Sequence, residues 1–127
     1  MNYLLDTNVF IWFMAGNDQL PEGITKTIVD RQNHIYLSAI SIWEIIIKER
    51  LGKLHFDTDI FKAIDIFLNE GTLLILPLMK DHLLPLRIMP LHHRDPFDRV
   101  LISQAFSESM RLLYTDECFK DYTDFLI

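Results

Sequence analysis

The chain has 127 residues, of which 50% are hydrophobic and 24% are charged, so it can bury a substantial core and is not a disordered chain. Its formal net charge of −6 excludes attraction of the whole molecule to phosphate, so nucleic acid must be bound by local basic groups or by metal. The single cysteine, Cys118, excludes an internal disulfide. With no signal-peptide pattern and no apolar run near the ~18 residues of a membrane span, we expect a single cytoplasmic domain over residues 1–127 that crosses no membrane.

The first segment, Asn2 to Asn8, is an apolar run that ends on polar side chains. This pattern is typical of a buried parallel strand, and ligands of parallel sheets bind beyond the carboxyl ends of the strands. We therefore expect Asp6 to lie at a site. The alternative is that Asp6, Thr7 or Asn8 caps the following helix, because each side chain can accept a hydrogen bond from its first N–H groups.

The next segments predict two helices and a second strand. Residues 9–14 are apolar on nearly every side and predict a short, covered helix that ends near Gly16. A second helix is expected from Pro21 to about Gln32. The β-branched and aromatic segment His34 to Ser38 predicts a strand, after which Ser38 and Ser41 are candidate helix caps.

The helix predicted from Ile40 to Leu51 is hydrophobic on several faces, which is typical of a buried helix, yet it contains Glu44. An unpaired buried carboxylate is costly. Glu44 therefore forms a salt bridge with Lys48 one turn later, points to solvent, or meets a cation at a site. Gly52 is expected to end the helix as a left-handed cap.

The second half of the chain predicts further helices and strands in alternation. In order, these are a helix over Asp57–Asn69, a strand over Leu73–Leu76, a short helix over Met79–Arg87 that Pro85 ends or kinks, and a loop over Pro90–Arg94 with His92 and His93. A helix follows over Asp95–Ser109, with Asp95 as its N-cap and Asp98 in its first turn. The last expected elements are a strand over Leu112–Thr115 ending before Asp116, a short helix over Glu117–Tyr122, and an edge strand over Phe125–Ile127.

Four acidic residues are expected at one edge of the sheet. Asp6 and Asp116 follow strands, and Glu44 and Asp98 lie in the first turns of helices. Carboxylates about 4 Å apart repel by roughly 4 kcal/mol at an effective dielectric constant of 20, so the four are either dispersed or bind metal. Oxygen ligands without cysteine favour Mg²⁺ or Mn²⁺, whose chemistry suits phosphodiester hydrolysis.

The segments LLDTN, SAISIWEIIIKERLGKL, HRDPFDRVLISQA and LLYTDECF, in this order, resemble the PIN-domain ribonucleases and, among them, the VapC toxins of type II toxin–antitoxin systems. The resemblance implies an α/β fold of three layers, α/β/α, around a mainly parallel sheet. It also implies magnesium-dependent RNA cleavage and inhibition by a cognate antitoxin. The acidic positions of the family fall on Asp6, Glu44, Asp98 and Asp116, with Asp6 and Asp98 as the main metal ligands.

Several further residues have open roles. Thr7 and Thr115 either hydrogen-bond a ligating carboxylate or a metal-bound water, or cap locally. Asp95 matches the family motif, but its role as a helix cap is sufficient to explain it. Arg99 could steer phosphate. A basic group has two alternative roles: it either faces RNA or the antitoxin, or it forms a solvated helix face. Its residues are Lys48, Arg50 and Lys53.

The mechanism expected from this assignment has Asp6, Asp98 and Asp116 holding magnesium while Glu44 positions or deprotonates the attacking water. The alternative function is a catalytically silent PIN-like module whose apolar helices bind another chain. Apolar residues over Phe10–Met14 and Ile40–Ile47 indicate either such a surface, for a homodimer or an antitoxin helix, or simple core burial.

Overall fold

The computed structural model describes residues 1–92 and 95–126. Its elements, in chain order, are β1 (Asn2–Leu5), α1 (Thr7–Ala15), α2 (Glu22–Val29), β2 (His34–Ser38), α3 (Ala39–Arg50), α4 (Ile60–Asn69), β3 (Leu74–Leu76), α5 (Lys80–Leu83), the 3₁₀ helix η1 (Leu84–Arg87), α6 (Pro96–Glu108), β4 (Arg111–Leu113) and the 3₁₀ helix η2 (Glu117–Phe125). No helix within the described ranges is long and apolar enough to span a bilayer.

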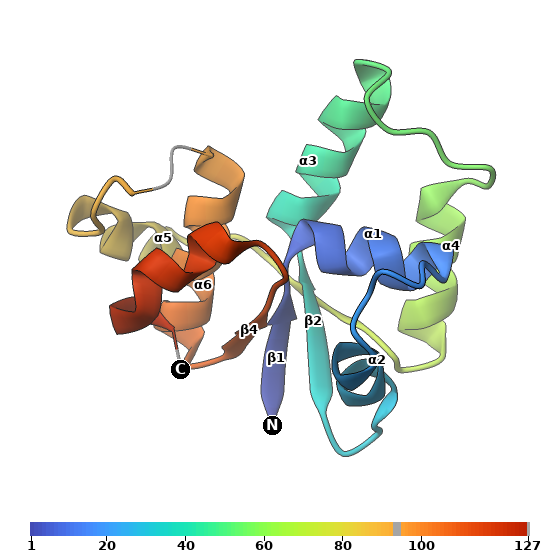
Figure 1. Cartoon of the computed structure of the whole chain (residues 1–127), viewed down its shortest axis with the longest axis horizontal. Helices are drawn as coiled ribbons and strands as arrows, with labels where there is room; N and C mark the ends of the chain where they lie inside the picture. The colour runs from blue at the N-terminus through green and yellow to red at the C-terminus, as the bar shows by residue number, and fades with distance from the viewer. Residues whose placement is uncertain (93–94, 127) are drawn as a thin grey trace.

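The four strands form one parallel sheet in the order β3-β2-β1-β4. Leu4 of β1 lies opposite Tyr36 of β2 on one side and Leu112 of β4 on the other. From β1 the chain first adds β2 and β3 on one side and then returns to add β4 on the other (Figure 1). This reversal of strand order places a switch point at the carboxyl ends of β1 and β4, where ligands of open α/β sheets bind.

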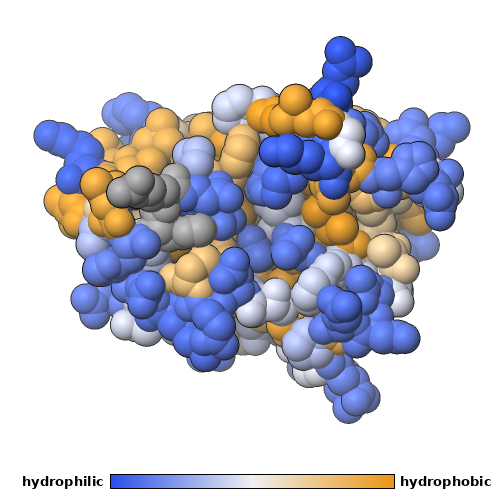
Figure 2. Space-filling view, turned by 45° about the horizontal axis from the view of Figure 1, so that its top comes forward, coloured by the Kyte–Doolittle hydropathy of each residue, from blue (hydrophilic) through white to orange (hydrophobic). Residues whose placement is uncertain are grey.

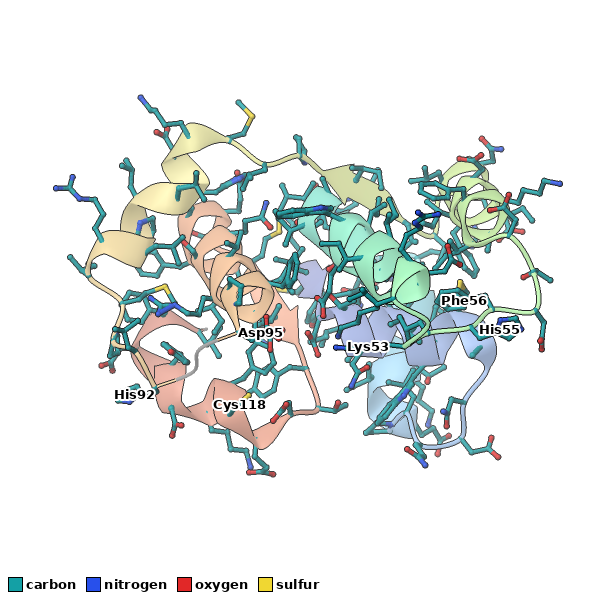
Figure 3. The ribbon with its side chains drawn as sticks, turned by 90° about the horizontal axis from the view of Figure 1, so that it is seen from above. Lys53, His55, Phe56, His92, Asp95 and Cys118 are labelled. Carbon is teal, nitrogen blue, oxygen red and sulfur yellow. The ribbon has the colours of Figure 1, made fainter. Side chains whose placement is uncertain are left out.

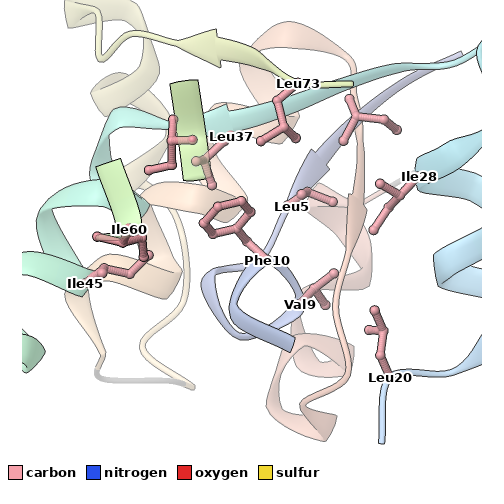
Figure 4. Close-up of a cluster of buried hydrophobic side chains, with 11 residues drawn as sticks. Leu5, Val9, Phe10, Leu20, Ile28, Leu37, Ile45, Ile60 and Leu73 are labelled. Carbon is pink, nitrogen blue, oxygen red and sulfur yellow. The ribbon is translucent and has the colours of Figure 1, made fainter. Parts of the chain in front are cut away.

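Helices cover both faces of the sheet. Successive side chains of a strand point to opposite faces, so neighbouring residues of β1 pack in different cores. Leu5 packs in a core with residues of α1, α2, α3 and α4, including Phe10 and Ile45 (Figure 4). Leu4 packs in a second core with residues of α6 and η2, including Leu101 and Phe119. The predicted three-layer α/β/α architecture is therefore confirmed.

Most element boundaries in the first half lie close to those predicted. The strand over His34–Ser38 is found as expected, and Ser38 caps α3 by accepting a hydrogen bond from the N–H of Ile40 at 3.0 Å. The helix α2 ends at Val29, before the predicted Gln32, because Asp30 has an extended backbone. The helix α4 begins three residues late, because the capping carboxylate is Asp59, which accepts from the N–H of Phe61.

The C-terminal predictions need more correction. Of the two alternatives at Pro85, a kink is not found: the helix α5 ends at Leu83, two residues earlier, and Pro85 lies in the first turn of the 3₁₀ helix η1. The edge strand expected over Phe125–Ile127 is wrong for Phe125, which ends η2 and packs its ring 5.3 Å from that of Phe106. Ile127 lies outside the described residues, as do His93 and Arg94 of the predicted loop. His92 packs edge-on against Tyr122.

The helix α3 is less buried than its composition predicts. It extends beyond the edge of the sheet (Figure 1). Trp43 is 56% exposed although its ring packs against Phe97, and Ile46 is 37% exposed. By contrast Phe10 is fully buried and residues 11–14 are half-buried, so core burial explains the apolar run in α1.

Candidate active site

A small polar hollow lies at the carboxyl edge of the sheet, where α1, α3, α6 and η2 begin. Its volume is about 140 Å³, and we call it the acidic hollow; it is lined by Asp6, Thr7, Asn8, Glu44, Lys48, Asp95, Asp98, Asp116 and Phe119. Figure 2 is turned so that this edge comes forward, and hydrophilic residues gather across the middle of that face. Figure 3 looks down on the edge and shows Asp95 at the start of α6, next to α3.

Asp6 is delivered to the acidic hollow by β1. Its backbone N–H donates to the carbonyl of Leu113 at 2.9 Å, so the pairing of β1 with β4 continues as far as the site. Its side chain is 4% exposed. Asp6 occupies the N-cap position of α1, but its side chain accepts no capping hydrogen bond. Capping therefore does not explain this carboxylate.

Burial raises the pKa of Asp6 from 3.8 to about 7. The negative charges of Asp98, Glu44 and Asp116 contribute to this increase, whereas the backbone N–H of Thr7 opposes it. All three other predicted acids thus act on Asp6 electrostatically. The expected convergence of four carboxylates at one edge of the sheet is what the structure has.

Glu44 lies in the second turn of α3, not in the predicted first turn, because the helix begins at Ala39; it points inward and is 3% exposed. Its Oε1 lies 2.8 Å from the hydroxyl of Thr7, and its Oε2 lies 2.6 Å from the Nζ of Lys48. Of the alternatives for Glu44, exposure to solvent is excluded and the salt bridge is present. The hydroxyl of Thr7 also lies 2.8 Å from that of Ser41. Because Glu44 can only accept, Thr7 donates to Glu44, and Ser41 is free to donate to Thr7.

Two of the acids also cap helices. The Oδ1 of Asp95 accepts from the N–H groups of Phe97 at 2.9 Å and Asp98 at 3.4 Å, as predicted for an N-cap. The Oδ1 of Asp116 accepts from the N–H of Cys118 at 3.0 Å, which caps η2. Asp95 and Asp116 also line the acidic hollow, together with Asp98 in the first turn of α6.

Other candidates do not reach the acidic hollow. Arg99 donates from Nη2 to the backbone carbonyl of Met89 at 3.5 Å, and neither Arg99 nor Thr115 is among the lining residues. Arg50 ends α3 and Lys53 follows it (Figure 3 labels Lys53), and both are exposed. Of the predicted basic group, only Lys48 lines the acidic hollow.

Gln104 is a supporting residue that the sequence did not reveal. It is fully buried, its Oε1 accepts from the hydroxyl of Ser38 at 2.6 Å, and its Nε2 lies 3.3 Å from the carbonyl of Pro77. Ser38 caps α3, so Gln104 ties the helix that carries Asp98 to the start of the helix that carries Glu44. The only available signal was a polar residue among the buried apolar positions of α6.

The acidic hollow fits a hard divalent cation by the chemistry of its donors, which are carboxylate, hydroxyl and amide oxygens. Within residues 1–92 and 95–126, no three His, Cys, Asp or Glu side chains are arranged so that they could hold a metal ion together. Among the described residues that line the acidic hollow, Lys48 contributes the one positively charged side chain. Burial alone lowers its pKa, but Glu44, Asp95 and Asp98 outweigh that effect and raise it.

The fold and site define an α/β protein with an acidic centre at the switch point of a parallel sheet. The model of the family described as "PIN domain" matches residues 3–124, so the chain belongs to the PIN-domain family. A chain of the crystal structure of VapBC2 from Rickettsia felis, bound to a DNA fragment from their promoter, is similar in fold. The TM-score is 0.67 at 20% identity, with 100% of this chain and 96% of that chain covered. No curated protein matches this chain.

Proposed function

We propose that this protein is a magnesium-dependent endoribonuclease and the VapC-like toxin of a type II toxin–antitoxin system, acting in the cytoplasm as a single domain over residues 1–127. The observation that carries the proposal is the convergence of Asp6, Glu44, Asp98 and Asp116 on one acidic hollow. Membership of the PIN-domain family and the similarity in fold to a chain of the VapBC2 complex support it. Four carboxylates so close together need positive charge, which a divalent cation would supply.

In the proposed reaction, Asp6, Asp98 and Asp116 would hold Mg²⁺, for which Mn²⁺ could substitute. The ion supplies charge neutralisation and a lowered pKa for the attacking water. Glu44 orients that water and accepts its proton, and Thr7 holds Glu44 in place through Oε1. Attack of the water oxygen on phosphorus would break the bond to the 3′ oxygen, which would take a proton from solvent and leave as a 3′-hydroxyl, and the other product would carry a 5′-phosphate.

The proposed partners are the RNA substrate, a cognate antitoxin and a second copy of the chain. Support for an antitoxin comes from the structure of VapBC2, one chain of which is similar in fold to this chain. Support for a homodimer comes from exposed apolar residues around an open hollow lined in part by Leu84, Ile88 and Phe106. We call these three residues with Pro85 the apolar face.

The test is cleavage of a labelled pool of small RNA by purified protein, with Mg²⁺ and with chelator. We expect discrete products that require Mg²⁺ and decrease by roughly 100-fold or more in Asp6→Asn and Asp98→Asn. Asp65→Asn makes the same chemical change at an exposed position of α4 and controls for contaminating nuclease and for folding.

A folded, antitoxin-free protein that neither cleaves this RNA nor binds Mn²⁺ would contradict the proposal. That result would favour a catalytically silent PIN-like module that binds other proteins.

A further inference from the structure

We propose that the ammonium of Lys48 is a built-in counter-cation of the acidic hollow. It neutralises Glu44 when no metal is bound and leaves Glu44 when a divalent cation enters. The inference rests on the proposed function, since it concerns the same metal site. It assigns to Lys48 a positioning role that governs how tightly metal is held.

The geometry of the pair indicates which partner moves. The Nζ of Lys48 lies 2.6 Å from the Oε2 of Glu44, and the side chains are 41% and 4% exposed, respectively. Glu44 is therefore almost wholly removed from water and is also held by Thr7. Lys48 has a flexible four-carbon stem and a path to solvent. A cation held by Asp6, Asp98 and Asp116 beside Glu44 would therefore displace Lys48 and leave Glu44 where it is.

Lys48 lies at the acidic hollow and is partly exposed to solvent. It lines the acidic hollow, and its ammonium experiences the charges of Glu44, Asp95 and Asp98. A divalent ion in a space of about 140 Å³ would repel the ammonium, so binding of one weakens binding of the other. With its two oxygens bonded to Thr7 and Lys48, Glu44 is already engaged. This agrees with the finding that no three acids among the described residues are arranged to hold an ion.

A second pair in the chain provides a matched comparison. Lys26 and Glu22 have the same spacing along α2, with a distance of 3.3 Å and side chains 74% and 82% exposed. Exposed pairs of this kind contribute little, because water screens both charges. Removing Lys48 leaves the buried carboxylate of Glu44 without its counter-charge, whereas removing Lys26 leaves only the exposed carboxylate of Glu22.

The test is titration of the metal-free protein with Mn²⁺ by calorimetry. Lys48→Met keeps the length of the side chain and removes its charge, and we expect it to bind Mn²⁺ roughly tenfold more tightly than the wild type. Lys48→Gln, whose amide can still donate to Glu44, should also bind more tightly, and it serves if Lys48→Met does not fold. Lys48→Arg keeps the charge, and its affinity for Mn²⁺ should be the closest to that of the wild type. Lys26→Met should be unchanged.

Thermal unfolding supplies a readout that does not depend on activity. In chelator, Lys48→Met should unfold at a lower temperature than the wild type, because Glu44 loses its counter-charge. Mn²⁺ should raise its Tm by more than it raises that of the wild type. Adding Glu44→Gln to Lys48→Met should restore stability in chelator, because neither charge is then present.

The outcomes separate this inference from the function on which it rests. If the wild type binds Mn²⁺ and the neutral Lys48 variants bind it equally or more weakly, the counter-cation role is overturned and the metal site stands. Equal Mn²⁺ binding together with lost cleavage would instead assign Lys48 to contact with the substrate. If neither the wild type nor any folded Lys48 variant binds Mn²⁺, both the inference and the proposed metal site fail.

Discussion

At the scale of single residues, the position of Asp6 illustrates how a common pattern acquires a chemical role. A polar residue directly before a helix is often a cap, and Asp95, Asp59 and Ser38 all act in that way here. Asp6 has the same local setting but makes no capping bond and is buried among other acids. Its carboxylate is thus left available for a ligand.

Stability in chelator should depend on pH through Asp6. The folded pKa of Asp6 is raised from 3.8 to about 7, so between these values the folded protein keeps a proton that the unfolded chain has lost. The free energy of unfolding should therefore fall as pH rises from about 4 to 7, by up to about 1.4 kcal/mol per pH unit from this group. Asp6→Asn cannot titrate and should not show this contribution.

Urea unfolding of both proteins at several pH values measures the difference. We expect the free energy of unfolding of Asp6→Asn, relative to that of the wild type, to increase between about pH 4 and 7 and to level off above pH 7. Parallel curves across this window would show that the pKa of Asp6 is not raised.

At the scale of elements, the site depends on how α3 and α6 are held together. Each helix carries one inward acid, Glu44 or Asp98. The buried bond between Ser38 and Gln104 links the two helices at the level of the sheet edge. Because both groups are fully buried, loss of one partner leaves the other unsatisfied. The relative placement of the acids thus relies on a residue that need not touch substrate.

Gln104→Leu should destabilise the protein by about 1–3 kcal/mol, because the size of the side chain is nearly kept while Ser38 loses its acceptor. Chemical denaturation measures this cost. Ser107→Ala is the matched control in α6, because its exposed hydroxyl makes only a 3.3 Å contact with the carbonyl of Asp81. Its effect should lie within about 0.5 kcal/mol.

The double variant Ser38→Ala with Gln104→Leu completes the cycle. We expect it to be more stable than the sum of the single effects predicts, since the two residues share one bond. Strict additivity would mean that this bond does not couple the helices.

At the scale of the whole molecule, the structure decides between the two alternatives for the apolar run over Phe10–Met14, which were a partner surface and core burial. The run over Phe10–Met14 belongs to the core, whereas Ile88 is 75% exposed and Leu84 is 50% exposed. Both belong to the apolar face, which lies over α6 and η1, across the sheet from α4 (Figure 1). Exposed patches of this kind on soluble proteins commonly mark interaction surfaces.

If the apolar face joins two copies, Ile88→Glu should convert a dimer into a monomer, because the interface would have to bury an unpaired charge. Light scattering during gel filtration measures this as a fall from twice the chain mass of 15.0 kDa to that mass. Phe61→Glu places the same charge at a 46% exposed site on α4 and should leave the assembly unchanged. Equal masses for the wild type and Ile88→Glu would exclude this face as the dimer interface.

Features that depend on near neighbours in the chain could be predicted well. Ser38 and Asp95 cap their helices through bonds that span only two or three residues, so the local sequence specifies them. The α/β class follows from alternating strand and helix patterns, and the meeting of four acids follows from the parallel arrangement of strands. The weakest predictions were at Pro85 and Phe125, where packing decides between turn, 3₁₀ helix and strand.

The sequence by itself determined which residues are chemically equipped for the site: the carboxylates of Asp6, Glu44, Asp98 and Asp116, and no competing cysteine cluster. Only the tertiary structure decided how they are partnered. Thr7 reaches Glu44 across 37 positions of sequence, and Ser38 reaches Gln104 across 66. Side-chain periodicity specifies the face of a helix but not which distant element packs on it, so the partners of a buried polar group follow from packing alone.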